Sequence, residues 1–109
     1  MTINGSTTDA DRYMWLTAAI GDRHSGKAGT GVLLDLGSSG TNITIQDRYT
    51  IVEWLEVTDA RGDWICGIAI KSGGQSSIVR DCIVHDINNP DFAGGGGIYA
   101  GGDPWTQPE

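Results

Sequence analysis

Short runs of alternating hydrophobic and polar residues recur along the whole chain. They are rich in Ile, Val, Leu and Thr, and they cover residues 13–18, 31–36, 42–46, 50–58, 67–71, 78–85 and 97–100. Alternation of this kind is typical of β-strands with one buried face. Clusters of Gly, Ser, Asp and Asn separate the runs and favour turns. No window has the apolar spacing of an amphipathic helix, so the pattern predicts an all-β chain.

An internal repeat is the strongest signal in the chain. The run at residues 51–59 (IVEWLEVTD) returns at residues 78–86 (IVRDCIVHD). A second pair follows, at residues 67–70 and 97–100, with a slightly larger offset because the loop between them is longer. Repetition at a period of about 20–50 residues indicates a solenoid, in which each unit buries its apolar side against its neighbours.

Superposition of the repeats places similar side chains in columns. The columns are Ile43, Ile68 and Ile98; Ile45, Ile70 and Ala100; Val52 and Val79; Leu55 and Cys82; and Val57 and Val84. If successive rungs pair in parallel, about 4.8 Å apart, each column becomes a stack inside a coil. Val52 and Leu55 are three positions apart, so both point inward only if the chain bends between them. The same bend is expected at residues 80–81.

Residues 76–86, followed by residues 97–100, resemble the repeat of right-handed parallel β-helix proteins, the pectate lyase-like superfamily. Trp54 and Asp81 stand at the bends where that pattern has Asn. The resemblance extends over residues 42–103 and implies a right-handed parallel β-helix (solenoid) segment of about three rungs. Residues 49–57 look most like secreted or cell-surface bacterial β-helix proteins of unassigned activity. The resemblance to that group implies that this chain is an extracellular scaffold.

The repeats also suggest how the chain is organised. We expect an irregular first rung or cap over residues 1–41, β-helix rungs over residues 42–103, and a truncated C-terminal tail over residues 104–109. The segment is therefore interpreted as part of a larger protein. An open end rung exposes unpaired strand edges, which provide a route to end-to-end self-association.

Charge and composition narrow the classes of partner. The net charge of −7 argues against nucleic acid and anionic lipid as partners, because both attract clustered Lys and Arg. No apolar run is long enough to span a membrane, and residues 1–5 do not resemble a signal peptide. An export signal is therefore expected outside this segment. Two cysteines, Cys66 and Cys82, are too few for a disulfide scaffold.

Two aspartates suggest a calcium site. Asp59 and Asp86 occupy equivalent positions of the repeat, so their carboxylates are expected about one rung apart, with Asp63 and Asp91 in adjacent loops. Oxygen ligands at this spacing suit Ca²⁺. The alternative is that each Asp makes a local turn or cap.

Three aromatic residues are the candidates for carbohydrate binding. Trp64 and Trp105 are expected in loops beside acidic residues, and Tyr99 is expected on the outward face of a sheet with Thr44 and Ala69. Exposed rings beside hydrogen-bonding groups commonly hold sugars. A loop Trp that covers the coil is the other interpretation.

Two further motifs carry less weight. Residues 21–27 match the GxxxxGK part of a phosphate-binding loop, but Ala28 replaces the Ser or Thr that holds Mg²⁺. We expect a surface loop there. His85 beside Asp86 suggests a general base and the carboxylate that orients it. Neighbours in a strand point to opposite faces, however, so His85 is interpreted as a surface residue.

These observations predict a non-catalytic extracellular scaffold that presents loops to polysaccharide or to a cell-surface glycan. The outward positions supply no pair of carboxylates suited to glycoside hydrolysis. No catalytic residue is assigned in the segment. The alternative is the N-terminal fragment of a polysaccharide lyase or glycoside hydrolase whose catalytic residues lie beyond Glu109.

Overall fold

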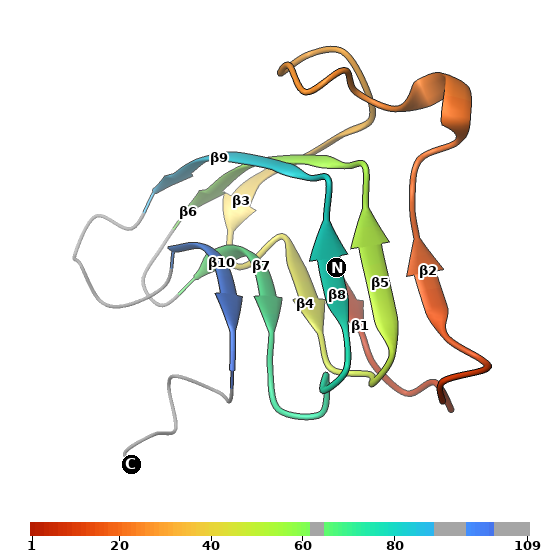
Figure 1. Cartoon of the computed structure of the whole chain (residues 1–109). Coiled ribbons are helices and arrows are strands. Elements are labelled where there is room, and N and C mark those ends of the chain that lie inside the picture. The colour runs from red at the N-terminus through yellow and green to blue at the C-terminus, as the bar shows by residue number, and fades with distance from the viewer. Residues whose placement is uncertain (62–64, 89–95, 102–109) are drawn as a thin grey trace.

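Three parallel sheets make up the molecule. A computed structural model describes residues 1–61, 65–88 and 96–101 (Figure 1). The first sheet contains β1 (Thr2–Ile3), β4 (Ile43–Ile45), β7 (Cys66–Ile70) and β10 (Gly96–Ala100). The second sheet contains β2 (Met14–Leu16), β5 (Thr50–Glu53) and β8 (Ile78–Arg80). The third sheet contains β3 (Leu33–Ser39), β6 (Glu56–Arg61) and β9 (Ile83–Asn88). A short 3₁₀ helix, η1 (Ile20–Asp22), lies between β2 and β3.

The order of the strands makes the chain a coil. Every strand pairs in parallel with the strand three places away in the sequence, so the chain visits the three sheets in turn and then returns to the first. This confirms the prediction of an all-β chain with parallel strands. In the described residues, no helix has the length and apolar character needed to cross a membrane.

The register of the strands confirms most of the predicted columns. Ile68 of β7 lies between Ile43 of β4 and Ile98 of β10. Val52 pairs with Val79, and Val57 pairs with Val84. The columns also continue toward the N-terminus, where β1, β2 and β3 pair in register with β4, β5 and β6. The strand β1 was not predicted, because it is too short to show alternation.

Left-handed backbone conformations recur at equivalent positions in successive turns of the coil. Among the described residues, the non-glycine positions with positive φ form three pairs: Tyr49 and Ser76, Trp54 and Asp81, and Asp59 and Asp86. The members of each pair are separated by the period of the sequence repeat. Trp54 (φ 59°) and Asp81 (φ 52°) lie between the second and third sheets, at the bends that the sequence predicted. Non-glycine residues seldom adopt this conformation, so its recurrence indicates that successive turns of the coil are built in the same way.

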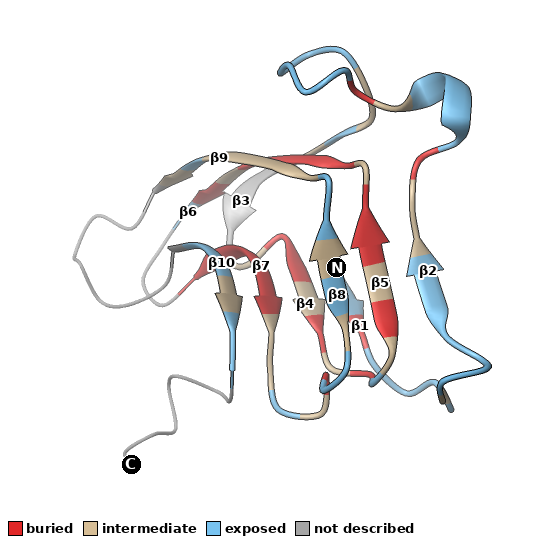
Figure 2. Ribbon diagram, in the orientation of Figure 1, coloured by how far each residue is buried: buried red, intermediate tan, exposed pale blue. Residues whose placement is uncertain are grey.

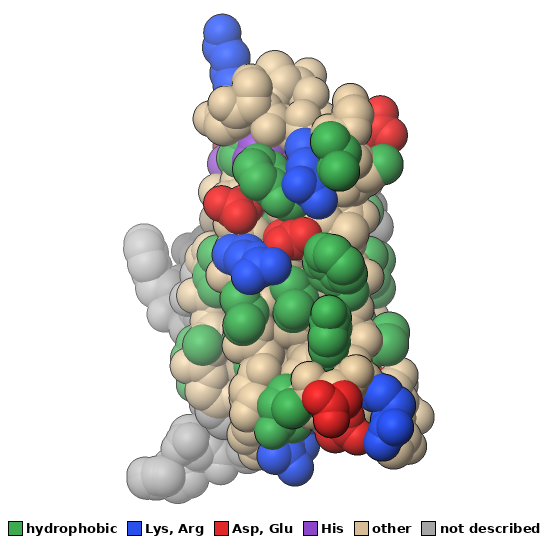
Figure 3. All heavy atoms as spheres, turned by 45° about the vertical axis from the view of Figure 1, so that its right-hand side comes forward, with side chains coloured by type: hydrophobic (Ala, Val, Ile, Leu, Met, Phe, Trp, Pro, Cys, Tyr) green, Lys and Arg blue, Asp and Glu red, His purple; other side chains and the backbone are tan. Residues whose placement is uncertain are grey.

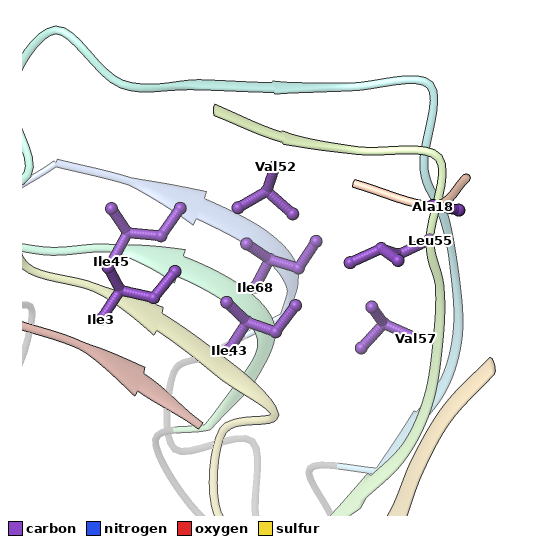
Figure 4. Packing of buried hydrophobic residues seen from close by; sticks show 8 residues of the cluster. All are labelled: Ile3, Ala18, Ile43, Ile45, Val52, Leu55, Val57 and Ile68. Carbon is purple, nitrogen blue, oxygen red and sulfur yellow. The ribbon is translucent and has the colours of Figure 1, made fainter. Parts of the chain in front are cut away.

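The core fills the space enclosed by the three sheets. Figure 4 shows isoleucines from the first sheet facing Val52, Leu55 and Val57 across this space. The isoleucines are Ile3, Ile43, Ile45 and Ile68. Burial is greatest in the middle strands β4 to β7, whereas β2, β8 and β10 are largely exposed or intermediate (Figure 2). Stacking of rungs is therefore the main source of burial, because a strand with a neighbour on one side only remains partly exposed.

The segment between β2 and β3 packs against the corner at Trp54. The His24 ring lies 5.3 Å from the Trp54 ring, and the Arg23 guanidinium lies over the same indole. The Gly26 N–H donates to His24 Nδ1, so Nε2 carries the proton and donates to the Asp81 carbonyl. The GxxxxGK motif begins in η1 and continues as a loop that leads to β3, and no helix N-terminus follows it to bind a phosphate.

Candidate functional site

The outer surface of the second sheet carries exposed apolar and aromatic side chains. The core-facing residues of its strands alternate with Trp15, Ile51 and Ile78, which therefore face outward in one register. Trp15 is 53% exposed and Ile78 is 45% exposed. These residues, together with Tyr13 and Tyr49 beside them, form what we call the aromatic face. Figure 3 brings this side forward, and hydrophobic side chains gather at its centre with acidic and basic side chains beside them.

The aromatic face contains a hollow beside its rings. The rings of Tyr13 and Trp15 lie 6.4 Å apart at an angle of 56°. A cavity of ≈ 300 Å³ is lined in part by Tyr13, Tyr49, Ile51 and Ile78. The Arg48 guanidinium lies over the Tyr49 ring, 5.3 Å from its centre. The surface therefore offers flat rings, an apolar hollow and a nearby cationic donor.

A buried carboxylate anchors the exposed indole. Only 4% of the Glu53 side chain is exposed. Its Oε2 accepts hydrogen bonds from Trp15 Nε1 (2.9 Å) and Thr17 Oγ1 (3.0 Å), and its Oε1 accepts one from Arg80 Nε (2.7 Å). Arg23 lies 3.8 Å away. The hydrogen bond from Arg80, followed by those from Trp15 and Thr17, lowers the pKa of Glu53. An ionised carboxylate therefore fixes the orientation of the Trp15 ring.

A second polar cluster lies on the outer surface of the third sheet. His85 Nε2 is 2.5 Å from Glu56 Oε2, and His85 Nδ1 is 2.9 Å from Asp86 Oδ2. Thr58 Oγ1 lies 3.3 Å from the same Nδ1. The expectation that His85 and Asp86 point to opposite faces was wrong. Asp86 has a φ of 57°, which breaks the alternation of the strand and lets its carboxylate meet the His85 ring.

His85 and Glu56 shift each other's pKa values. Hydrogen bonds to Glu56 and then to Asp86 raise the pKa of His85. The pKa of Glu56 is lowered first by the Gly29 N–H, which donates at 2.9 Å, and then by His85. Both effects favour an ion pair. Because Gly29 belongs to the segment before β3, the pair also joins that segment to β6 and β9.

The predicted calcium ligands lie close to each other. Asp59 and Asp86 line one cavity of ≈ 390 Å³ together with Arg61 and Ile87. Arg61 Nε donates to Asp59 Oδ1 at 2.9 Å, and Asp86 contacts His85, so each carboxylate has a partner within the chain. Asp63 and Asp91 lie outside the described residues. In the described part of the chain, no group of three or more His, Cys, Asp or Glu residues is arranged to hold a metal ion. Calcium binding at Asp59 and Asp86 stays a prediction.

The predicted carbohydrate-binding residues are not the ones that form the aromatic face. Tyr99 lies on β10 of the first sheet, beside Ala69 of β7, and is partly buried. Trp64 and Trp105 lie outside the described residues. The signal for the aromatic face was present in the sequence, since Tyr13 and Trp15 are two positions apart in a predicted strand and therefore share one side of it.

Comparison of the chain with protein-family models, with curated proteins and with solved structures finds no match. The functional argument therefore depends on the geometry of the chain itself.

Proposed function

We propose that this chain is a right-handed parallel β-helix scaffold that binds carbohydrate through the aromatic face. We place it in a secreted or cell-surface protein of which it forms one part. The observation that carries the proposal is Trp15, whose ring is half exposed although its indole N–H is held by the buried Glu53. An aromatic ring kept in place at the surface is suited to contact a ligand, because little conformational freedom is lost on binding.

The chemistry around Trp15 supports a sugar as the ligand. Sugars offer apolar C–H faces that stack on aromatic rings, together with hydroxyl groups that need donors and acceptors. Tyr13 and Trp15 supply the rings, and Arg80, whose side chain is 48% exposed, supplies donors beside them. The net charge of −7 also disfavours nucleic acid as the ligand.

Trp15→Ala tests the proposal directly. We expect the wild-type chain to bind at least one member of a panel of neutral and acidic polysaccharides, measured by affinity electrophoresis and calorimetry, and the variant to lose that binding. Ile20→Ala is the matched control, because Ile20 is 82% exposed and lies on η1, outside the aromatic face.

Two outcomes would count against a carbohydrate ligand. One is an absence of binding across the panel. The other is a wild-type chain that self-associates in sedimentation experiments and becomes monomeric in Trp15→Ala, which would make the aromatic face an interface between copies of the chain.

A further inference from the structure

We infer that Glu53 is the positioning residue of the aromatic face, holding Trp15 and Arg80 in the arrangement in which they contact a sugar. The inference rests on the proposed function and assigns a role to a residue that does not itself reach the ligand. Glu53 is buried, whereas Trp15 and Arg80 are each about half exposed.

The placement of Glu53 allows it to act on several rungs at once. Glu53 ends β5, the middle strand of the second sheet. Trp15 belongs to β2 on one side of it, and Arg80 ends β8 on the other side, in register with Glu53. The two oxygens of the Glu53 carboxylate have different partners, since Oε2 accepts hydrogen bonds from Trp15 and Thr17 while Oε1 accepts one from Arg80. One carboxylate therefore sets the distance between an aromatic ring and a guanidinium that come from different turns of the coil.

The hydrogen bond from Arg80 leaves that side chain suited to ligand binding. It uses Nε of the guanidinium, and the terminal nitrogens carry further N–H donors. A free arginine samples many conformations, whereas one held through Nε presents the remaining donors from a defined position. Trp15 is held in the same way through its single N–H, which leaves the face of the ring to stack.

Glu53→Gln tests whether the carboxylate holds both Trp15 and Arg80, because an amide keeps the size of the side chain but has a single acceptor oxygen. If that oxygen faces Trp15, an NH₂ group meets the Arg80 guanidinium, and the two donors repel. We expect the Trp15 indole N–H and the Arg80 Nε–H resonances in ¹H–¹⁵N spectra to move without any ligand present. With cellohexaose and polygalacturonate as probes, we expect affinity to fall about tenfold or more, as for loss of a hydrogen bond to a charged group.

Glu56→Gln is the matched control. Glu56 is buried to the same degree as Glu53, but it faces the third sheet and contacts His85 and Gly29. A general effect of losing a buried carboxylate appears in both variants, whereas a positioning role changes the Trp15 and Arg80 resonances in Glu53→Gln alone. Unmoved resonances in Glu53→Gln, or equal loss of affinity in both variants, would overturn the inference.

Trp15→Phe provides a second test that keeps the Glu53 carboxylate in place. Phe preserves an aromatic ring and removes the N–H that Glu53 holds. Weaker binding is expected, and wild-type affinity would show that the anchor is not needed. Should the wild-type chain bind no member of the polysaccharide panel, the proposed function fails, while the resonances of the ligand-free variants still decide whether Glu53 positions these two side chains.

Discussion

Replacement of Ile68 by Ala removes the central member of the column that Ile43, Ile68 and Ile98 form. Ile68 is completely buried, with Ile43 in register on one side and Ile98 on the other. Truncation of a buried Ile to Ala costs about 2–5 kcal/mol, and the upper part of the range applies where the surroundings cannot close around the cavity. Both neighbouring strands are tied to β7 by backbone pairing, so we expect a loss of about 3–5 kcal/mol. That is a large share of the roughly 5–15 kcal/mol that stabilises a typical domain.

Ile98→Ala is the control for this experiment. Ile98 has the same position in the column, but it is 51% exposed. Complete burial of a large aliphatic side chain contributes about 1.5–3 kcal/mol, so loss of the buried half of Ile98 should cost about 1 kcal/mol. The comparison isolates burial within the stack, because the residue type, the sheet and the substitution are identical.

The measurement is urea denaturation followed by circular dichroism, with the free energy of unfolding taken from midpoints at unchanged slope. A loss below about 1 kcal/mol for Ile68→Ala, or equal losses for the two variants, would refute the argument that the rungs are stabilised by stacking of their side chains.

Three further predictions concern packing, pH and calcium. Gly67→Ala should destabilise the fold by about 1–3 kcal/mol in the same assay, since a Cβ would lie 2.5 Å from a Val84 methyl group, whereas Gly21→Ala, with open space around it, should not. Because the pKa of His85 is raised in the folded chain, the stability that protonated His85 contributes is complete below pH 6.5, its ordinary pKa, and is lost as pH rises through the raised pKa. Melting temperatures of His85→Gln measured across this pH range should lack this pH dependence. Calcium should bind to the wild-type chain and not to Asp59→Asn, and calorimetry without heat would exclude that site.

The sequence was sufficient to predict the stacking but not the outer surface. Periodicity reports which residues face the core, so it predicts the columns through Ile68 and Val52 and the bend at Trp54. Side chains outside the core are placed by local backbone conformation, and nothing in the pattern marked Asp86 as left-handed. The contact between His85 and Asp86 was therefore excluded by a rule of alternation that does not hold at that residue.

The aromatic face escaped prediction for a different reason. Trp15 lies outside the sequence repeat, so no equivalent residue placed it in a column with Ile51 and Ile78. Its partner Glu53 is 38 residues away in the sequence. The sequence predicts Trp64 and Trp105 instead, because each stands in an expected loop beside acidic residues, and exposed rings beside acceptors commonly hold sugars. Only the register between β2 and β5 brings the exposed Trp15 ring next to the buried Glu53 carboxylate.

The outward row of Trp15, Ile51 and Ile78 runs along the axis of the coil, with one position from each turn. Each extra turn of such an architecture lengthens the row by about 4.8 Å and leaves existing neighbours undisturbed. Duplication of a single unit is thus enough to extend a contact surface in measured steps. An architecture of this kind can match the length of a polymeric ligand simply by gaining or losing whole units.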